Sequence, residues 1–152
     1  MRLQVGDRAP AFTLTDEAGE RVSLRNFAGQ RLVLYFYPAD DTPGCTAEAC
    51  QFRDALSMFR GLNVTVIGVS PDDAARHRAF IAKYDLTFTL LSDPDRLVMA
   101  KYGAYGEKQL YGKTVTGVIR STFVIGPTQR IEHAWYGVRA NGHAARVLAA
   151  LA

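Results

Sequence analysis

The alternation of apolar and polar positions along the chain predicts strands that are separated by helices. Two continuous apolar runs, 31–37 and 64–70, are typical of strands that are buried on both faces of a sheet. Shorter alternating or apolar segments predict the remaining strands: 12–15, 22–24, 88–91, 122–125 and 131–136. This order favours an α/β sheet with helices on both faces, in which the last two strands add an antiparallel edge.

Helical periodicity and capping residues predict four helices. The longest covers 42–60, with Thr42 as its N-cap, Pro43 in the first helical position and Gly61 just after its end. Its apolar stripe consists of Cys45, Ala49, Phe52, Leu56 and Phe59. The other helices are expected at 70–84, with Ser70 as the N-cap, at 93–102, and after Asn141-Gly142, where the final helix carries Val147, Leu148 and Leu151.

The size and composition of the chain suit a single globular domain over residues 1–152. Apolar residues make up 48% and charged residues 22% of the sequence, and no internal repeat or linker divides it. The net charge of +3 comes from scattered residues, so we expect no nucleic-acid partner. The apolar runs are too short to cross a bilayer, and the N-terminal segment lacks the features of a signal or transit peptide, which predicts a cytoplasmic protein without a membrane partner.

Cys45 and Cys50 lie five positions apart in the longest predicted helix. In the reducing cytoplasm, such a pair favours catalysis, redox sensing or metal binding over a structural disulfide. Cys45 falls in the first helical turn, where unpaired backbone amides and the positive end of the helix dipole favour the nucleophilic thiolate. Gly44 permits close approach to the backbone and Thr42 adds a hydroxyl, so this turn offers donors for the negative charge that develops on a leaving oxygen.

Charged residues near Cys45 also affect whether its thiol ionises. Asp40 and Asp41 would disfavour a thiolate, so we expect both side chains to point into solvent. Arg120 directly precedes a predicted strand of the same sheet and is the candidate cation for stabilising the thiolate. On a continuous helix, the Cα atoms of Cys45 and Cys50 lie ~8–9 Å apart, beyond the ~7 Å that a disulfide bridges. A disulfide between them therefore requires the helix to unwind over residues 43–52.

Simpler interpretations of these residues compete with catalysis. A buried cysteine is most often a small apolar side chain. A metal site needs further ligands at suitable spacing, whereas His77, His133 and His143 are scattered, and we expect no metal. His77 lies in a polar helical run, which predicts an exposed side chain. The chain has no glycine-rich nucleotide-binding loop, so no cofactor is expected.

Residues 35–50 closely resemble the active-site motif of peroxiredoxins, in the branch known as bacterioferritin comigratory protein or peroxiredoxin Q. Pro38, Thr42 and Cys45 match the family pattern Pro-x-x-x-Thr-x-x-Cys, and a second cysteine five residues later is typical of this branch. Further segments are similar to the family at 6–14, 120–125 and 142–143, so the resemblance covers almost the whole chain.

This resemblance implies a thioredoxin-like three-layer α/β/α sandwich with an N-terminal β-hairpin extension. It also implies a role for each matching residue: Cys45 as the peroxidatic cysteine, Cys50 as the resolving cysteine, Thr42 as the hydrogen-bond partner of the peroxide, Pro38 as the shield of the sulfenic acid, and Arg120 as the group that stabilises thiolate and transition state. The sequence departs from the family pattern at two places. Ala39 stands where a lysine is frequent, and residues 126–129 replace the usual turn.

The residues and the resemblance together imply a thiol-dependent peroxidase. It would reduce hydrogen peroxide and alkyl hydroperoxides through a sulfenic acid on Cys45 and a Cys45–Cys50 disulfide, with thioredoxin or a related dithiol as reductant. The resemblance further implies a monomer. Two alternatives remain open: a redox sensor that uses the same cysteine pair to switch a partner, and a disulfide reductase, against which the CxxxxC spacing argues.

Overall fold

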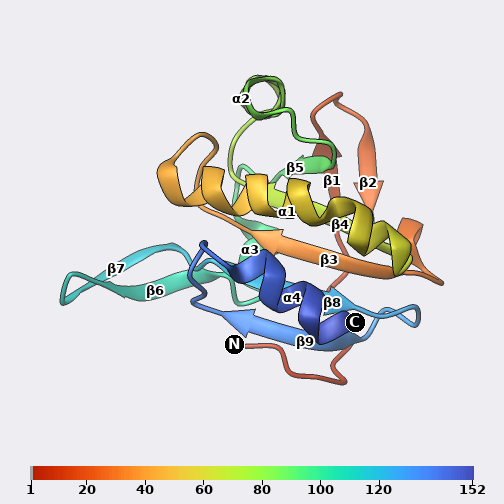
Figure 1. Cartoon of the computed structure of the whole chain (residues 1–152). Coiled ribbons are helices and arrows are strands. Elements are labelled where there is room, and N and C mark those ends of the chain that lie inside the picture. The colour runs from red at the N-terminus through yellow and green to blue at the C-terminus, as the bar shows by residue number, and fades with distance from the viewer. Residues whose placement is uncertain (1) are drawn as a thin grey trace.

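The computed structural model describes residues 2–152 and contains the predicted alternation of strands and helices (Figure 1). The elements are β1 (Thr13–Asp16), β2 (Arg21–Ser23), the short 3-10 helix η1 (Leu24–Phe27), β3 (Arg31–Phe36), α1 (Pro43–Gly61), β4 (Val64–Ser70), α2 (Ala74–Tyr84), β5 (Thr89–Ser92), α3 (Leu97–Lys101), β6 (Tyr105–Leu110), β7 (Lys113–Val118), β8 (Ser121–Ile125), β9 (Ile131–Tyr136) and α4 (His143–Leu151).

Seven strands form one sheet in the order β2-β1-β5-β4-β3-β8-β9. Strands β3, β4 and β5 run parallel to one another, whereas β1, β2, β8 and β9 pair antiparallel with their neighbours. Phe36, the last residue of β3, pairs with Ser121, the first residue of β8. Because these two strands run in opposite directions, the chain that leaves β3 towards α1 lies beside Arg120.

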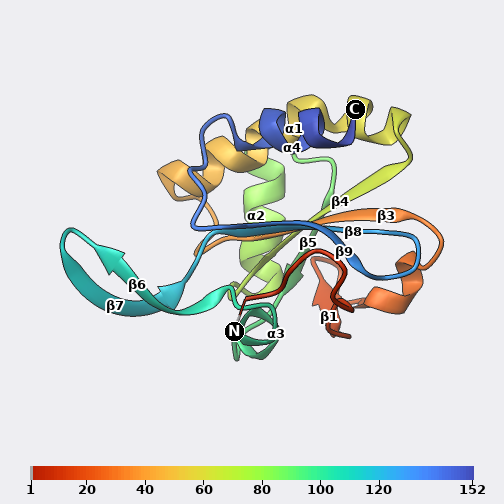
Figure 2. The same ribbon diagram turned by 90° about the horizontal axis from the view of Figure 1, so that it is seen from below.

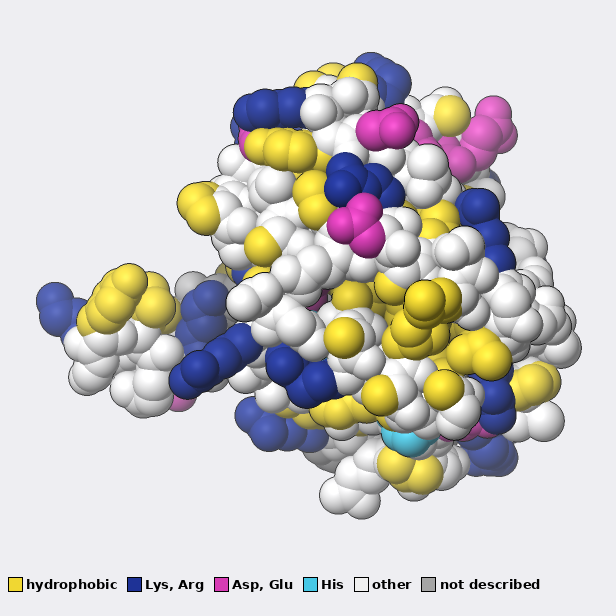
Figure 3. Space-filling model, in the orientation of Figure 1, with side chains coloured by type: hydrophobic (Ala, Val, Ile, Leu, Met, Phe, Trp, Pro, Cys, Tyr) yellow, Lys and Arg dark blue, Asp and Glu magenta, His cyan; other side chains and the backbone are white. Residues whose placement is uncertain are grey.

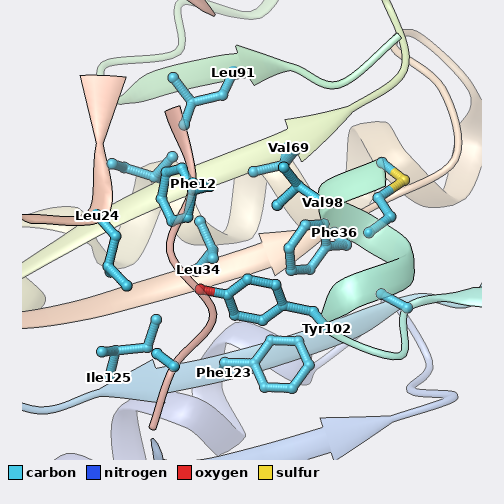
Figure 4. Packing of buried hydrophobic residues seen from close by; sticks show 14 of the residues in the cluster. Phe12, Leu24, Leu34, Phe36, Val69, Leu91, Val98, Tyr102, Phe123 and Ile125 are labelled. Atoms are coloured by element: carbon cyan, nitrogen blue, oxygen red, sulfur yellow. The ribbon is translucent and has the colours of Figure 1, made fainter. Parts of the chain in front are cut away.

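Helices cover both faces of this sheet, with α1 and α4 on one face and α3 on the other (Figure 2). The side chains of β3 alternate between two buried clusters, which explains why its sequence is a continuous apolar run. Phe36 belongs to the cluster on the α3 face, where it packs against Tyr102 and Phe123 (Figure 4). Tyr35 belongs to the cluster under α1, where its ring stacks on Phe52. These layers confirm the predicted sandwich with its N-terminal hairpin.

The structure corrects the predicted start of the second helix. Ser70 is the last residue of β4, and α2 begins three residues later than predicted, with Asp73 as its N-cap. The Asp73 carboxylate accepts a hydrogen bond from the Arg76 amide, whereas Ser70 pairs with Ser92 of β5. Both serine and aspartate are favoured capping residues. Ser70 cannot be the cap because it pairs with β5 as part of β4, so the helix is capped by Asp73 instead.

The ends of two other helices also differ from the prediction. Gly61 is the last residue of α1 rather than the residue after it, and the C-cap is Leu62. The helix expected at 93–102 covers only α3, because the residues before it form a turn in which Arg96 has a left-handed backbone conformation.

Residues 105–118 form a hairpin, β6 and β7, for which the apolar pattern predicts no element. Most of its side chains are exposed, so it lacks the core-facing alternation by which a strand is recognised. Its turn consists of Tyr111 and Gly112, both with positive φ, as the favoured two-residue hairpin turn requires. The hairpin projects from the body of the molecule, and Tyr111 at its tip is 97% exposed (Figure 1).

The charged side chains on the face shown in Figure 3 are dispersed rather than gathered into one basic patch. Among residues 2–152, no helix combines the length and the apolar character that a membrane span needs.

We predict that Gly68→Ala destabilises the fold, because Gly68 of β4 leaves room for the Tyr35 ring of β3. A Cβ atom at Gly68 would lie 2.8 Å from Tyr35 Cζ and 2.9 Å from Leu90 Cδ2, both in the packed core. The expected loss is about 1–3 kcal/mol in the free energy of unfolding, measured by urea denaturation. In the control variant Gly106→Ala, the added Cβ meets no atom within 4 Å and should cause no such loss. Equal stability of both variants would contradict this packing argument.

Candidate active site

Cys45 lies in the first turn of α1, as the sequence predicts, and is only 2% exposed. Thr42 is the N-cap of this helix, with an extended backbone, but its side chain makes no capping hydrogen bond. Instead, the Thr42 hydroxyl donates a hydrogen bond to the carbonyl of Ala39 at 2.9 Å. With its proton so engaged, the Thr42 oxygen presents its lone pairs as an acceptor for the O–H group of a bound molecule.

Arg120 contacts both Cys45 and a second side chain on the same helix. Its Nη2 lies 3.4 Å from Cys45 Sγ, and its Nη1 lies 2.6 Å from Glu48 Oε1. Gly44 leaves room for this arrangement, because a Cβ atom there would lie 3.2 Å from Arg120 Nη2, a tight contact that would push the guanidinium away by a few tenths of an ångström. A positive charge at this distance stabilises a thiolate, so the structure brings the predicted cation to the predicted nucleophile.

Glu48 is the partner of Arg120 that the sequence analysis did not identify. Its side chain is fully buried, and Oε2 has no hydrogen-bond partner in residues 2–152. Burial raises the pKa of Glu48 to about 7, and the charge and hydrogen bond of Arg120 oppose this shift. Burial lowers the pKa of Arg120, but the charges of Glu48 and Cys45 more than offset this effect and raise it overall. A carboxylate three positions after Cys45 on the helix was the available signal, since i and i+3 share a helix face.

Asp40 and Asp41 were both expected to point into solvent, and for Asp40 this prediction is wrong. Asp40 is buried, and its Oδ2 lies 2.6 Å from Nδ1 of His77. Asp41 is exposed as predicted and forms an ion pair with Lys83 at 2.9 Å. Hydrogen bonds from Lys83 and Tyr84 lower the pKa of Asp41. Each carboxylate beside the active-site turn thus has its own partner.

The prediction of an exposed His77 is also wrong, because its side chain is 0% exposed. His77 lies on the face of α2 that packs against the sheet, and Nε2 contacts the carbonyl of Leu91 in β5 at 3.0 Å. The polar residues around it in sequence occupy the other faces of the helix. The polar residues on either side of His77 in the sequence therefore led to the wrong prediction that it is exposed.

Pro38 and Cys50, the other two predicted site residues, are both half-buried. Pro38 lies in the bend between β3 and α1, on the chain that leads to Thr42. Cys50 lies on α1, which is continuous from Pro43 to Gly61, and no disulfide joins it to Cys45 in the described residues. With both cysteines on one continuous helix, their Cα atoms are ~8–9 Å apart.

Metal binding receives no support from the described part of the chain. No group of three or more His, Cys, Asp or Glu side chains in residues 2–152 could hold an ion. His133 stacks on Trp135, and His143 contacts the hydroxyl of Thr122 through Nε2. Burial, with smaller contributions from Arg146 and Arg120, lowers the pKa of His143 to about 4.

We predict that Glu48→Gln changes the pH dependence of stability. The wild-type carboxyl keeps its proton up to a pKa of about 7 when folded but only to about 4.5 when unfolded, so the folded state loses stability as pH rises between these values. The variant has no such proton. Relative to wild type, its free energy of unfolding should therefore rise by up to ~3 kcal/mol between pH 4 and pH 8, as measured by denaturation at each pH. A constant difference would mean that folding leaves the pKa of Glu48 unchanged.

Comparison with known proteins identifies the family of this chain. The model of the AhpC/TSA family matches residues 5–134. A putative peroxiredoxin of Mycobacterium tuberculosis strain H37Rv is 54% identical over 146 residues, covering 96% of this chain and 93% of that protein. Peroxiredoxin Bcp of Escherichia coli K12 is 43% identical over 141 residues, covering 93% of this chain and 90% of that protein.

Solved structures agree with these relatives. A cysteine-to-serine mutant of PrxQ from Xylella fastidiosa superposes with a TM-score of 0.92 at 39% identity, covering 99% of this chain and 96% of that one. A peroxiredoxin Q structure from Xanthomonas campestris has a TM-score of 0.86 at 41% identity, covering 92% of this chain and 89% of that one. The chain therefore belongs to the AhpC/TSA family, in its Bcp or peroxiredoxin Q branch, and is a thiol peroxidase.

Proposed function

We propose that Cys45 is the peroxidatic cysteine and that it reduces hydrogen peroxide and organic hydroperoxides to water or alcohols. The observation that carries this proposal is the buried sulfur in the first turn of α1, 3.4 Å from the Arg120 guanidinium. The thiolate attacks one oxygen of the O–O bond, which breaks. The sulfur becomes a sulfenic acid, and the second oxygen leaves with the electron pair and takes up a proton.

The roles of the neighbouring residues follow from their positions. Thr42 accepts a hydrogen bond from the O–H group of the peroxide, because its own proton is donated to Ala39. Arg120 stabilises the thiolate and the negative charge that develops on the leaving oxygen. Pro38, half-buried in the bend before Thr42, shields the sulfenic acid from water. A Xanthomonas campestris bacterioferritin comigratory protein has been described with alkyl peroxide reduction activity, which supports organic hydroperoxides as substrates.

Cys50 completes the cycle as the resolving cysteine. Its thiolate attacks the sulfenic sulfur of Cys45 and releases water, which forms the disulfide. A distance of ~8–9 Å between the Cα atoms exceeds the ~7 Å that a disulfide allows, so α1 must unwind over its first turns. Thioredoxin, or a related dithiol, then reduces the disulfide by exchange. We further infer that the chain acts in the cytoplasm as a monomeric single domain over residues 1–152.

The roles of the two cysteines predict different products after reaction with peroxide. Reduced protein is mixed with one equivalent of hydrogen peroxide under anaerobic conditions and followed by stopped-flow fluorescence and intact mass. Wild type should rapidly lose the mass of two hydrogens, Cys45→Ser should not react, and Cys50→Ser should gain one or more oxygens because its sulfenic acid has no resolving partner. Adding thioredoxin with its reductase should return the wild-type mass to the reduced value.

Slow oxidation that does not depend on which cysteine is replaced would contradict the peroxidase cycle. That result would favour the redox sensor, in which the same pair forms a stable disulfide without fast turnover. A fast cycle that thioredoxin cannot restart would contradict only the proposed reductant.

We also predict that oxidation unwinds the start of α1. Amide hydrogen exchange of residues 43–52 should become much faster in the disulfide form, because the first turns can no longer form their helical hydrogen bonds. Residues 53–61 carry Leu56 and Phe59, which remain packed in the core, and should keep their protection. Mass spectrometry of peptides from the reduced and oxidised forms measures both segments. Unchanged exchange in 43–52 would exclude an intramolecular Cys45–Cys50 disulfide.

A further inference from the structure

Asp40 and His77 form a buried polar pair behind the loop that carries Thr42. Asp40 is 2% exposed and His77 is 0% exposed. Asp40 belongs to the chain between β3 and α1, whereas His77 lies on α2, 37 positions later in the sequence. The pair does not contact Cys45, and the proposed reaction assigns it no step.

Every polar group of Asp40 has a hydrogen-bond partner. Its carboxylate accepts the Tyr37 hydroxyl at 2.5 Å and contacts His77 at 2.6 Å. Its amide donates to Asp72 at 2.6 Å, and its carbonyl accepts from Arg76 at 3.3 Å. Three of these four partners lie on α2 or just before it. Asp40 is therefore the point at which the active-site loop is attached to α2.

The ring of His77 determines where the protons of this pair lie. A carbonyl oxygen can only accept, so Nε2 must donate its proton to Leu91 at 3.0 Å. Nδ1 faces a carboxylate oxygen at 2.6 Å, and two lone pairs at that distance would repel, so a further proton lies between Nδ1 and Asp40. His77 thus joins the Asp40 carboxylate to β5 through both ring nitrogens.

The loop beyond Asp40 depends on this attachment. The Thr42 hydroxyl is oriented by the carbonyl of Ala39, the residue before Asp40. Asp41 connects Asp40 to Thr42 with a positive φ of 58°, a left-handed conformation that is uncommon for non-glycine residues. Fixing Asp40 therefore fixes both the acceptor that orients Thr42 and the turn that leads to Cys45.

We propose that His77 is a positioning residue for the reaction of Cys45. By holding Asp40 against α2, it fixes the loop 38–44 in the geometry that presents Thr42 to the peroxide. This proposal rests on the proposed function, since it assigns His77 an effect on the oxidation rate. A displacement of the loop by about 1 Å is enough to slow such a reaction by up to about a hundredfold.

The test compares variants that lose the attachment with one that keeps it. His77→Leu removes both ring hydrogen bonds, and His77→Gln keeps one donor but cannot reach both acceptors. Asp40→Asn retains the attachment, because its amide can donate to Nδ1 of a neutral His77 and its oxygen can still accept from Tyr37. The control is Tyr102→Phe, which loses a part-buried hydrogen bond to the carbonyl of Pro10; Tyr102 belongs to the cluster on the α3 face of the sheet.

Two measurements are made on each variant: the rate of Cys45 oxidation by hydrogen peroxide, followed by the fluorescence of Trp135, and amide exchange of residues 38–45. We expect both His77 variants to be oxidised about ten- to a hundredfold more slowly and to exchange faster in 38–45. Asp40→Asn should lose far less, and Tyr102→Phe should change neither value even where its stability falls.

Three results would overturn the proposal. These are an unchanged oxidation rate in the His77 variants, an equal slowing in Tyr102→Phe, and unchanged exchange in 38–45. If wild type itself does not react with peroxide, the proposed function fails. The exchange comparison would then still decide whether His77 fixes the loop.

Discussion

The guanidinium group of Arg120 is the interaction on which the geometry of this site depends, because it joins the sulfur of Cys45 to the buried carboxylate of Glu48. One end lies 2.6 Å from Glu48 and the other 3.4 Å from the sulfur. Removing Arg120 would leave the buried carboxyl of Glu48 without a charged partner, which is costly. Arg120 reaches this position because β8 pairs antiparallel with β3, and because Gly44 has no side chain to displace it. The pairing of β8 with β3, the start of α1 and the absence of a side chain at Gly44 therefore all contribute to the contact between Arg120 and Cys45.

The same contact explains how a rigid site can open during the proposed cycle. The thiolate of Cys45 attracts Arg120, whereas a sulfenic acid carries no charge, so oxidation removes part of what holds the first turn of α1. The rest of the helix is secured independently, since Leu56 and Phe59 are buried in the core beneath it. On the other side, Asp40 remains attached to α2. The segment that unwinds is thus bounded at both ends by contacts that oxidation does not touch.

The sequence predicted those parts of the site that are local in the chain. Thr42, Cys45 and the helix they begin follow from capping and periodicity, and the central strands follow from continuous apolar runs. Glu48 and His77 were missed because their roles depend on partners 72 and 37 positions away, which no local pattern reveals. The hairpin at 105–118 was missed for the opposite reason, since it packs against little and carries no apolar period. The choice of Asp73 over Ser70 as N-cap depended on strand pairing.

The carboxylates around Cys45 illustrate why charge cannot be assessed by counting residues. Three carboxylates lie close in sequence to the sulfur of Cys45: Asp40, Asp41 and Glu48. Only Asp41 is exposed to solvent, whereas the other two are buried. In the structure, each is matched with a cationic or proton-bearing partner: His77, Lys83 and Arg120 respectively. A matched pair acts on its surroundings as a dipole, whose field falls off faster with distance than that of a single charge. Arg120, which alone among these three partners also contacts the sulfur, is the positive charge placed to stabilise the thiolate of the proposed cycle.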